Sequence, residues 1–210
     1  MTRQTKAIAA AAAGAAGAAL LGALHWRRNP SACPYGQRWS LELPKPGVSA
    51  RRLVDLLDPR PGERLLEIGP GTGYYTLPVA ERLDGGRLEV FDLQREFLDL
   101  VTERARGRGL GNVVGWQGDA RELLFEADRF DGAFLALVLG EIPDQDAALR
   151  ELARVVKPGG RVVFGETAFD PHHVTPRTLK RRAEAAGLRF ERMAGTPAGY
   201  VARFAVPAAA

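Results

Sequence analysis

The feature that most constrains this chain is a glycine-rich turn between a short apolar run and a helical pattern. Residues 64–68 read Arg-Leu-Leu-Glu-Ile, and residues 69–73, Gly-Pro-Gly-Thr-Gly, follow at once. Residues 75–83 then have the apolar spacing of a helix. Glycine at every second position keeps side chains out of the turn, so the backbone can approach a bound ligand closely. The three segments predict the first strand, turn and helix of an α/β domain with a ligand at the turn.

Strand and helix patterns alternate along the chain. Before the first strand, Leu53, Leu56 and Leu57 recur at helical spacing after Ser49, a residue type that caps helices. Further strands are predicted at residues 87–91, 113–117, 131–139 and 161–165, and further helices at 97–108, 121–124 and 147–156. Strands that alternate with helices in this way form a parallel sheet.

The last part of the chain predicts a different connection. Residues 176–186 have a helical pattern that Gly187 ends, and strand patterns follow at 188–193 and 200–206. The turn between these strands is too short for a parallel crossover, which needs about a dozen residues or more. The last two strands are therefore expected to be antiparallel.

Acidic residues stand where the second and third strands end. Asp92 closes the second strand, nineteen residues after Gly73, and Gly118-Asp119-Ala120 follows the third. Each acidic residue alone is also typical of a helix cap or a turn. Together with the glycine turn, however, they converge at the edge where open α/β sheets bind ligands, and Asp92 has the spacing of a ribose-binding carboxylate.

These segments, in this order, resemble those of class I methyltransferases, and in particular the ubiquinone/menaquinone-biosynthesis-like branch. The resemblance covers about residues 50–205 and rests on residues 65–76, 92, 118–120, 130–132 and 149–160. It implies an α/β, Rossmann-like, doubly wound sheet of seven strands, mostly parallel with an antiparallel last strand. It also implies S-adenosylmethionine as the cofactor.

By the same resemblance, each part of the cofactor has its own protein partners. Glu67 would hold the methionine amino group directly or through water, the turn would line the methionine and ribose, Asp92 would bind the ribose, and the residues after the third strand would hold the adenine. The implied cofactor-binding residues are Glu67, Gly69, Gly71, Thr72, Gly73, Asp92, Asp119 and Ala120. A nicotinamide dinucleotide is disfavoured, because Gly-x-Gly-x-x-Gly would need a glycine at Tyr74.

The methyl acceptor determines whether a base is needed. Methyl transfer from a sulfonium is an in-line displacement, so the protein mainly aligns the acceptor and excludes water. A base is useful when the acceptor is a hydroxyl or an acidic carbon, and the candidates are Glu141, after the fourth strand, and His172 and His173, after the fifth. The alternatives for Glu141 are a cap on the next helix and a solvated side chain.

Several patterns narrow the class of partner. Residues 137–143 lack the Asn/Asp-Pro-Pro-aromatic signature that the resemblance would attach to adenine or glutamine amide methylation, and the domain has no cysteine for base-carbon methylation. With three histidines and one cysteine in the chain, no metal site is expected. The expected partner is therefore a small-molecule acceptor, apolar or membrane-associated, and not a nucleic acid. A non-catalytic, membrane-tethered binding module is the alternative function, and the sequence predicts no oligomeric state.

The N-terminal part of the chain predicts a hydrophobic helix. Residues 7–24 carry no charge, and at 1.5 Å per residue they reach about 27 Å, just short of a bilayer core. An uncleaved membrane anchor is preferred, while a cleaved signal peptide and a soluble or disordered alanine-rich extension remain alternatives. Cys33 is the only cysteine, so no intramolecular disulfide can form, and a cytoplasmic domain anchored to the membrane is expected.

The chain is accordingly divided into three regions. Residues 1–28 are expected to form the hydrophobic helix, and residues 29–50, which contain four prolines, a linker or a strap over the domain. Residues 51–210 are expected to form the methyltransferase domain.

Overall fold

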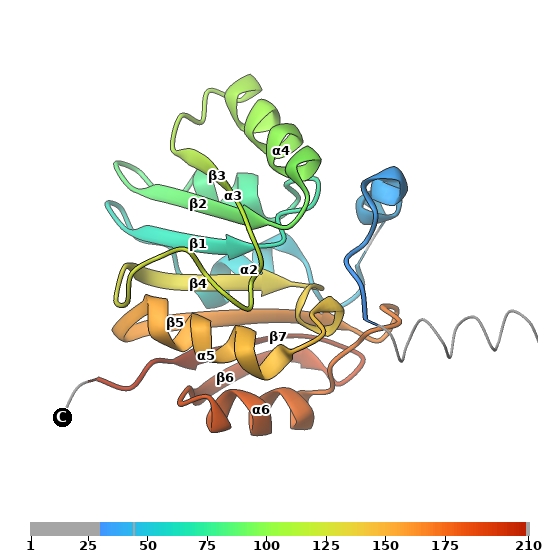
Figure 1. Ribbon diagram of the computed structural model, residues 1–210, viewed down its shortest axis with the longest axis vertical. Helices are drawn as coiled ribbons and strands as arrows, with labels where there is room; N and C mark the ends of the chain where they lie inside the picture. Colours follow the sequence, from blue (N-terminus) through green and yellow to red (C-terminus); the bar gives the residue numbers. More distant parts are fainter. Residues whose placement is uncertain (1–29, 44, 209–210) are drawn as a thin grey trace, which may run out of the picture.

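The computed structural model describes residues 30–43 and 45–208, which contain one sheet of seven strands in the order β3-β2-β1-β4-β5-β7-β6 (Figure 1). The strands are β1 (Arg64–Ile68), β2 (Arg87–Asp92), β3 (Val113–Gln117), β4 (Phe130–Ala136), β5 (Val156–Thr167), β6 (Arg189–Thr196) and β7 (Gly199–Ala205). The helices are η1 (Tyr35–Glu42), α2 (Ala50–Leu57), α3 (Thr76–Ala80), α4 (Arg95–Gly107), η2 (Leu139–Glu141), α5 (Gln145–Val155) and α6 (Pro176–Ala185), of which η1 and η2 are 3-10 helices.

The direction of the strands agrees with the sequence patterns. Neighbouring strands from β3 to β5 are parallel, whereas β7 is antiparallel to both β5 and β6. The prediction of a seven-stranded, mostly parallel, Rossmann-like sheet with an antiparallel last strand is therefore confirmed.

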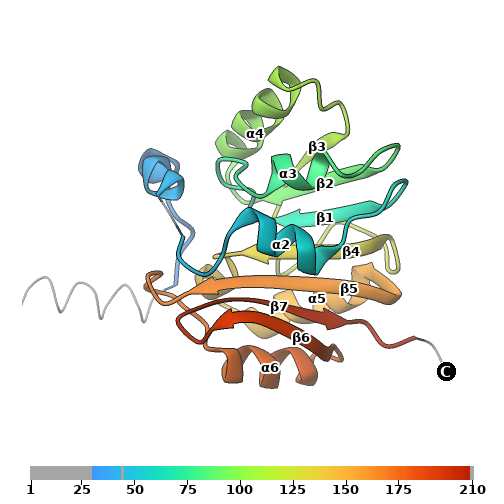
Figure 2. The ribbon, with the colours of Figure 1, turned by 180° about the vertical axis from the view of Figure 1, so that it is seen from behind.

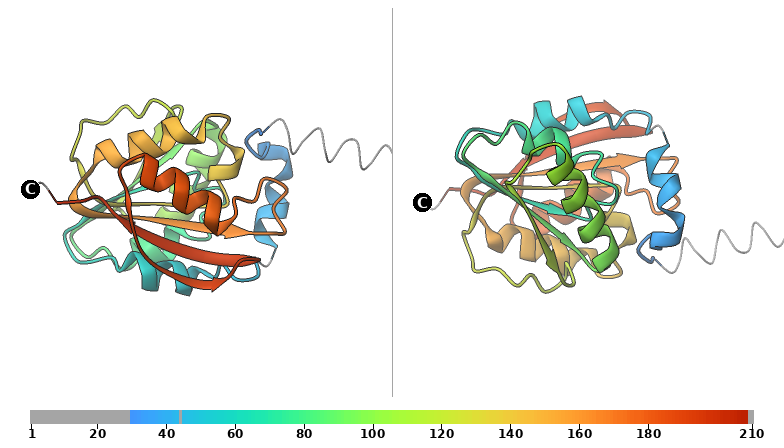
Figure 3. Two further views of the ribbon diagram at one scale, coloured as in Figure 1. Left: turned by 90° about the horizontal axis from the view of Figure 1, so that it is seen from below. Right: turned by 90° about the horizontal axis from the view of Figure 1, so that it is seen from above.

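Helices cover both faces of the sheet, and each face has its own core (Figures 2 and 3). On one face α2, α3 and α4 bury residues such as Leu53, Val79 and Val101, and on the other α5 and α6 bury residues such as Leu149 and Leu179. The helix α2 begins where the sequence predicts, because the Ser49 hydroxyl accepts a hydrogen bond from the Arg52 amide at 3.2 Å. This arrangement leaves the carboxyl edge of the parallel strands free of helices from the two layers.

The strand β4 ends earlier than expected, at Ala136 instead of residue 139. The next residue, Leu137, has φ 63°, a left-handed conformation that bends the chain out of the strand direction. Its amide still donates to the carbonyl of Gly165 at 2.8 Å, so the bend is fixed against β5. The chain then forms η2, which carries Glu141 across the carboxyl edge of the sheet.

Two other expectations were wrong in detail. Residues 121–124 form turns and not a short helix, because the Leu123 amide donates to the Glu151 carboxylate at 2.7 Å and its carbonyl accepts from Arg154 at 3.1 Å. These bonds to α5 replace the ones that a helix would make within itself. The strand β5 starts at Val156, five residues earlier than expected, with a bulge between its first pairing residue and Arg161.

The predicted strap contains a helix that the sequence did not indicate, namely η1. The predicted hydrophobic helix at residues 7–24 lies outside the described residues. Among the residues that the structure describes, no helix is both long enough and apolar enough to cross a membrane.

Candidate active site

A cavity of about 380 Å³ opens at the carboxyl edge of the sheet. Its walls come from the turn after β1, the ends of β2 and β4, the segment after β3, and the strap. The predicted site residues that line it are Gly69, Gly71, Thr72, Asp92, Asp119, Ala120 and Glu141. Residues far apart in the sequence thus meet at the place where α/β sheets bind ligands.

The turn after β1 adopts backbone conformations that favour glycine. Gly69 has φ 67°, and a Cβ at this position would lie 2.5 Å from a methyl carbon of Val138. Gly73 has φ 89° and faces the side chain of Val101 in α4, so it supports the turn from behind and is not among the cavity-lining residues. A larger residue at Gly69 would therefore push the segment after β4 away from the turn.

Glu67, in β1 just before the turn, is only 2% exposed. Its Oε2 atom has no hydrogen-bond partner among the described residues, and the same is true of the Thr72 hydroxyl. Burial raises the pKa of Glu67 from 4.5 to about 8. A buried carboxylate oxygen without a partner is costly, so this position suits a positively charged group of a ligand.

The raised pKa of Glu67 leads to a prediction about stability in the absence of ligand. A carboxyl whose pKa is higher in the folded state stabilises that state below about pH 4.5, and this contribution is lost as the pH rises through about 8. The melting temperature is therefore expected to fall between about pH 5 and about pH 8. The Glu67→Gln variant, which cannot titrate at this position, should show a shallower fall when thermal unfolding is followed across this range.

Other buried carboxyls also make the melting temperature depend on pH, so the Glu67→Gln variant is expected to remove only part of this dependence. Burial also raises the pKa values of Glu141 and Glu166 to about 8, and both act in the same direction as Glu67. If the Gln variant loses stability with pH as steeply as the wild type, Glu67 is ionised in the folded protein and the prediction fails.

Asp92 and Asp119, at the ends of neighbouring strands, differ in their electrostatic surroundings. The Oδ1 atom of Asp92 accepts a hydrogen bond from the Gln94 amide at 2.8 Å, and burial raises its pKa to about 6. Asp119 accepts hydrogen bonds from the guanidinium of Arg121, which lowers its pKa. Asp92 thus lines the cavity as a half-buried carboxyl, whereas Asp119 is a carboxylate that is already paired with Arg121.

Glu141 lines the cavity, because η2 carries it there. Its Oε2 atom accepts a hydrogen bond from the backbone amide of Cys33 at 3.2 Å. Burial, together with the nearby negative charge of Asp170, raises its pKa to about 8. The helix that follows is capped by Asp144, which accepts from the Ala147 amide at 2.9 Å, so Glu141 is neither a cap nor a solvated side chain.

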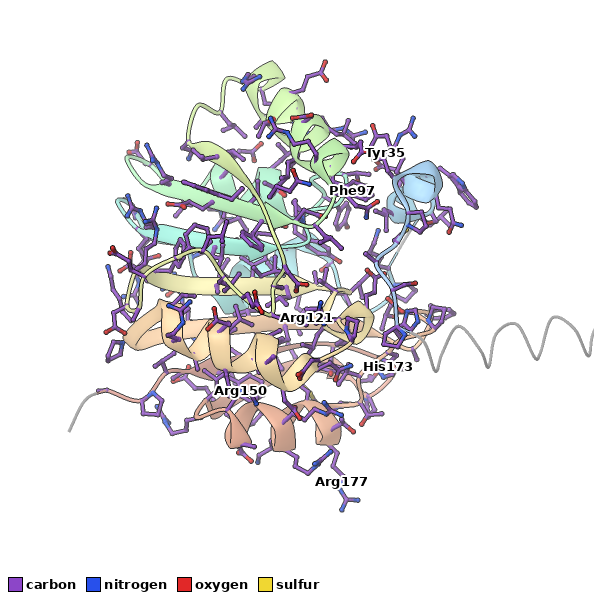
Figure 4. All side chains as sticks on the ribbon, in the orientation of Figure 1. Tyr35, Phe97, Arg121, Arg150, His173 and Arg177 are labelled. Atoms are coloured by element: carbon purple, nitrogen blue, oxygen red, sulfur yellow. The ribbon has the colours of Figure 1, made fainter. Side chains whose placement is uncertain are left out.

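His172 and His173 lie in the segment between β5 and α6 and are not among the residues that line the cavity. Figure 4 marks the position of His173. The carbonyl of His172 packs against Gly140, where a Cβ would come within 1.9 Å of it. The Nδ1 atom of His173 lies 3.8 Å from the carboxylate of Glu166. In the part of the chain that is described, no group of His, Cys, Asp and Glu residues is arranged to hold a metal ion.

Gln94 holds the strap to the sheet, and no sequence pattern indicated this contact. Its side-chain amide donates to the Cys33 carbonyl at 2.8 Å and accepts from the Tyr35 amide at 3.0 Å. The rings of Tyr35 and Phe97 meet edge to face 5.2 Å apart beside this pair (Figure 4). The strap is therefore fixed at the end of β2 by Gln94 and at the end of β4 by Glu141.

Comparison with known proteins agrees with the site. Residues 66–164 match the family model described as a methyltransferase domain. The chain is 36% identical over 126 residues to the ubiquinone/menaquinone biosynthesis C-methyltransferase UbiE of Vibrio vulnificus, which is 58% of this chain and 48% of that protein. It is 38% identical over 114 residues to nocamycin O-methyltransferase of Saccharothrix syringae, which is 54% of this chain and 41% of that protein. The chain thus spans about half the length of these relatives or less.

Solved structures share the fold at lower sequence identity. An S-adenosylmethionine-dependent methyltransferase from Aquifex aeolicus has a TM-score of 0.75 and 18% identity, and the match covers 83% of this chain and all of that one. The [4+2]-cyclase SpnF has a TM-score of 0.68 and 19% identity, covering 76% of this chain and 80% of that one. Residues 66–164 of this chain therefore match a methyltransferase domain, and its fold is similar to that of a solved S-adenosylmethionine-dependent methyltransferase.

Proposed function

We propose that this protein transfers a methyl group from S-adenosylmethionine to a small, apolar acceptor that has an acidic hydroxyl or carbon. The observation that carries the proposal is the buried Oε2 atom of Glu67, which has no hydrogen-bond partner among the described residues and directly precedes the glycine turn. Glu67 itself is not among the cavity-lining residues, but the turn that follows it lines the cavity together with Asp92 and Asp119. When bound, S-adenosylmethionine supplies an electrophilic methyl group on a positively charged sulfur.

The residues at the carboxyl edge suit the separate parts of this cofactor. Glu67 would pair with the ammonium group of the methionine part, directly or through water, because its Oε2 has no other partner among the described residues. Asp92 would accept hydrogen bonds from the ribose hydroxyls, and Asp119 with Ala120 would hold the adenine. Gly69, Gly71 and Thr72 would line the methionine and ribose, and Gly73 would shape the turn.

The remaining walls of the cavity suit an apolar acceptor. They include Leu41 of the strap, Tyr74, Val138 and Ile142, and Glu141 is the acidic side chain that the segment after β4 contributes. We assign Glu141 as the base that takes the proton lost by the acceptor, because a carboxyl with a pKa of about 8 holds a proton more tightly than an ordinary one. It is preferred over His172 and His173, because it lines the cavity and they do not.

We also propose that the acceptor is membrane-associated and that residues 7–24 tether the protein to the cytoplasmic face of a membrane. The tether is supported by residues 7–24, which carry no charge and precede the strap that forms one wall of the cavity. A small-molecule acceptor is supported by the relatives that are named for ubiquinone and menaquinone biosynthesis and for nocamycin.

A second candidate is a tethered module that binds S-adenosylmethionine without transferring its methyl group. The structural similarity to the [4+2]-cyclase SpnF supports this second candidate. The name of that protein denotes a reaction other than methyl transfer, so the same fold can serve without transferring a methyl group. The two functions differ at the acceptor end of the cavity. Transfer requires a base and a water-free acceptor wall, whereas binding alone requires only the glycine turn and the carboxylates.

Calorimetric titration of the full chain tests the proposal, with S-adenosylmethionine, S-adenosylhomocysteine and NAD as ligands. Binding of both sulfur compounds and not of NAD is expected, and it would justify assays of methyl transfer to quinones, phenols and lipids. If a folded sample binds neither sulfur compound, the glycine turn has only a structural role. If it binds both but methylates no acceptor of these classes, the binding module is the better description.

A further inference from the structure

The helix η1 in the strap buries none of its residues, although it runs for eight residues. Runs of 3-10 helix longer than three or four residues are uncommon, and surface helices are usually stabilised by packing an apolar face. Tyr35 and Leu41 face Phe97 and the cavity, but the largest apolar side chain of the helix is exposed. Trp39 is 66% exposed, and Leu43, which directly follows the helix, is 55% exposed.

A third apolar side chain lies at the same end of the molecule. Phe169 is 77% exposed in the segment between β5 and α6, and both this segment and η1 project beyond the carboxyl edge of the sheet (Figures 1 and 3). We call Trp39, Leu43 and Phe169 the apolar rim. Leu41, which stands between Trp39 and Leu43 in the sequence, and the half-exposed Tyr74 line the cavity, so the strap connects part of the rim to the cavity wall.

We propose that the apolar rim docks on the surface of an anionic lipid bilayer, with the cavity opening facing the interface. Tryptophan is the side chain most typical of the level of lipid headgroups, and leucine and phenylalanine insert just below it. The proposal adds a membrane-contacting surface of the folded domain, and it requires neither the tether nor methyl transfer.

The charges around the rim favour a bilayer over a protein partner. Arg38 is exposed and stacks over the ring of Tyr35, and Lys45 lies over the ring of Tyr74. The acidic residue of η1, Glu42, is paired with Arg104 at 2.8 Å, so its charge is neutralised. Lys45 is half-buried and donates to the carbonyls of Leu41 and Leu43, so Arg38 is the exposed cation of this group. An exposed cation next to an aromatic side chain suits the negative surface of anionic membranes.

The position of the preceding chain indicates the same occupant. The described residues begin at Pro30, which lines the cavity, and the uncharged residues 7–24 and the basic pair Arg27-Arg28 come shortly before it in the sequence. If a bilayer holds residues 7–24, only a short stretch of chain separates it from Pro30 at the cavity. A bilayer at that edge would cover the rim and leave the two helical layers free.

Fluorescence of Trp39 in the full chain tests the proposal. The Trp26→Phe and Trp116→Phe substitutions leave Trp39 as the single tryptophan, and phenylalanine retains the ring that Trp116 packs against Phe125. With vesicles of phosphatidylcholine and phosphatidylglycerol, the emission of Trp39 is expected to shift to shorter wavelength. Lipids brominated in their acyl chains are expected to quench it, whereas unbrominated lipids are not.

Substitutions in the rim supply a second measurement, the partition coefficient between vesicles and buffer. Phe169→Ser and Leu43→Ser are each expected to lower it by about tenfold, the loss of one apolar side chain from the interface. Leu124→Ser is the matched control, because Leu124 is 68% exposed but lies in the connection between β3 and β4 and not in the rim. It should leave the partition coefficient unchanged.

Three outcomes would overturn the proposal. If the chain binds vesicles but Trp39 is not quenched, residues outside the rim hold it to the membrane. If the chain does not bind vesicles, the rim does not dock on lipid. If the chain is instead a dimer that Trp39→Ser converts to a monomer, the rim is an interface between two copies.

Discussion

Replacing Glu141 with glutamine is expected to lower the turnover number by about 10²–10⁴-fold, the usual contribution of a general base. The affinity for S-adenosylmethionine should change little, because the cofactor is assigned to the glycine turn, Asp92 and Asp119 and not to Glu141. Glutamine keeps an oxygen that can accept the hydrogen bond from the Cys33 amide, so the strap stays in place. The substitution therefore removes the base and little else.

The pH dependence of turnover gives a sharper test of the same assignment. A base acts only when ionised, and the pKa of Glu141 is about 8. The turnover number of the wild type is therefore expected to rise with pH and to level off above about 8. In Glu141→Gln this rise should be absent, because the titrating group is gone.

Asp146→Asn is a matched control, since Asp146 is an exposed carboxyl nearby in the sequence that pairs with Arg182. It should retain the wild-type turnover and pH profile. If Glu141→Gln keeps both as well, Glu141 serves only to hold the strap through Cys33, and the reaction needs no base from this position.

The part of the site assigned to the cofactor was predictable from the sequence, because each of its residues stands next to a strand or turn pattern. The glycine turn follows an apolar strand directly, and Asp92 and Asp119 stand where strand patterns end. In a parallel sheet the carboxyl ends of the strands share one edge, so residues at these ends meet even though they are far apart in the sequence. Topology alone therefore brings this half of the site together.

The acceptor half was not predictable in the same way, because it depends on contacts between distant segments. Leucine rarely adopts a left-handed conformation, so nothing in the sequence indicates that Leu137 ends β4 and directs Glu141 into the cavity. The link from Gln94 to residues 33–35 joins a side chain to backbone about sixty positions away. A glutamine that follows a strand does not indicate by its sequence position that it bonds to the backbone of Cys33 and Tyr35.

Replacing Asp92 with alanine is expected to weaken the binding of S-adenosylmethionine by about tenfold to a hundredfold. Each hydrogen bond to a charged group contributes about 1.5–3 kcal/mol, and about 1.4 kcal/mol corresponds to a factor of ten in affinity. Because the pKa of Asp92 is about 6 in the free protein, the contribution of this carboxylate to affinity should also decrease as the pH falls through about 6. Calorimetric titration at several pH values measures both effects.

The ribose contact can be separated from an indirect effect through the strap. The Asp92 carboxylate also accepts a hydrogen bond from the backbone amide of Gln94. Loss of this carboxylate could therefore loosen the strap and weaken cofactor binding even if Asp92 does not contact the ribose. Analogues of S-adenosylhomocysteine that lack the 2′ or 3′ hydroxyl distinguish the two causes. They should bind more weakly than the parent compound to the wild type but equally well to Asp92→Ala, because the variant has no carboxylate left to accept those hydroxyls. An equal loss in both proteins would place the ribose away from Asp92 and assign the effect of the substitution to the strap.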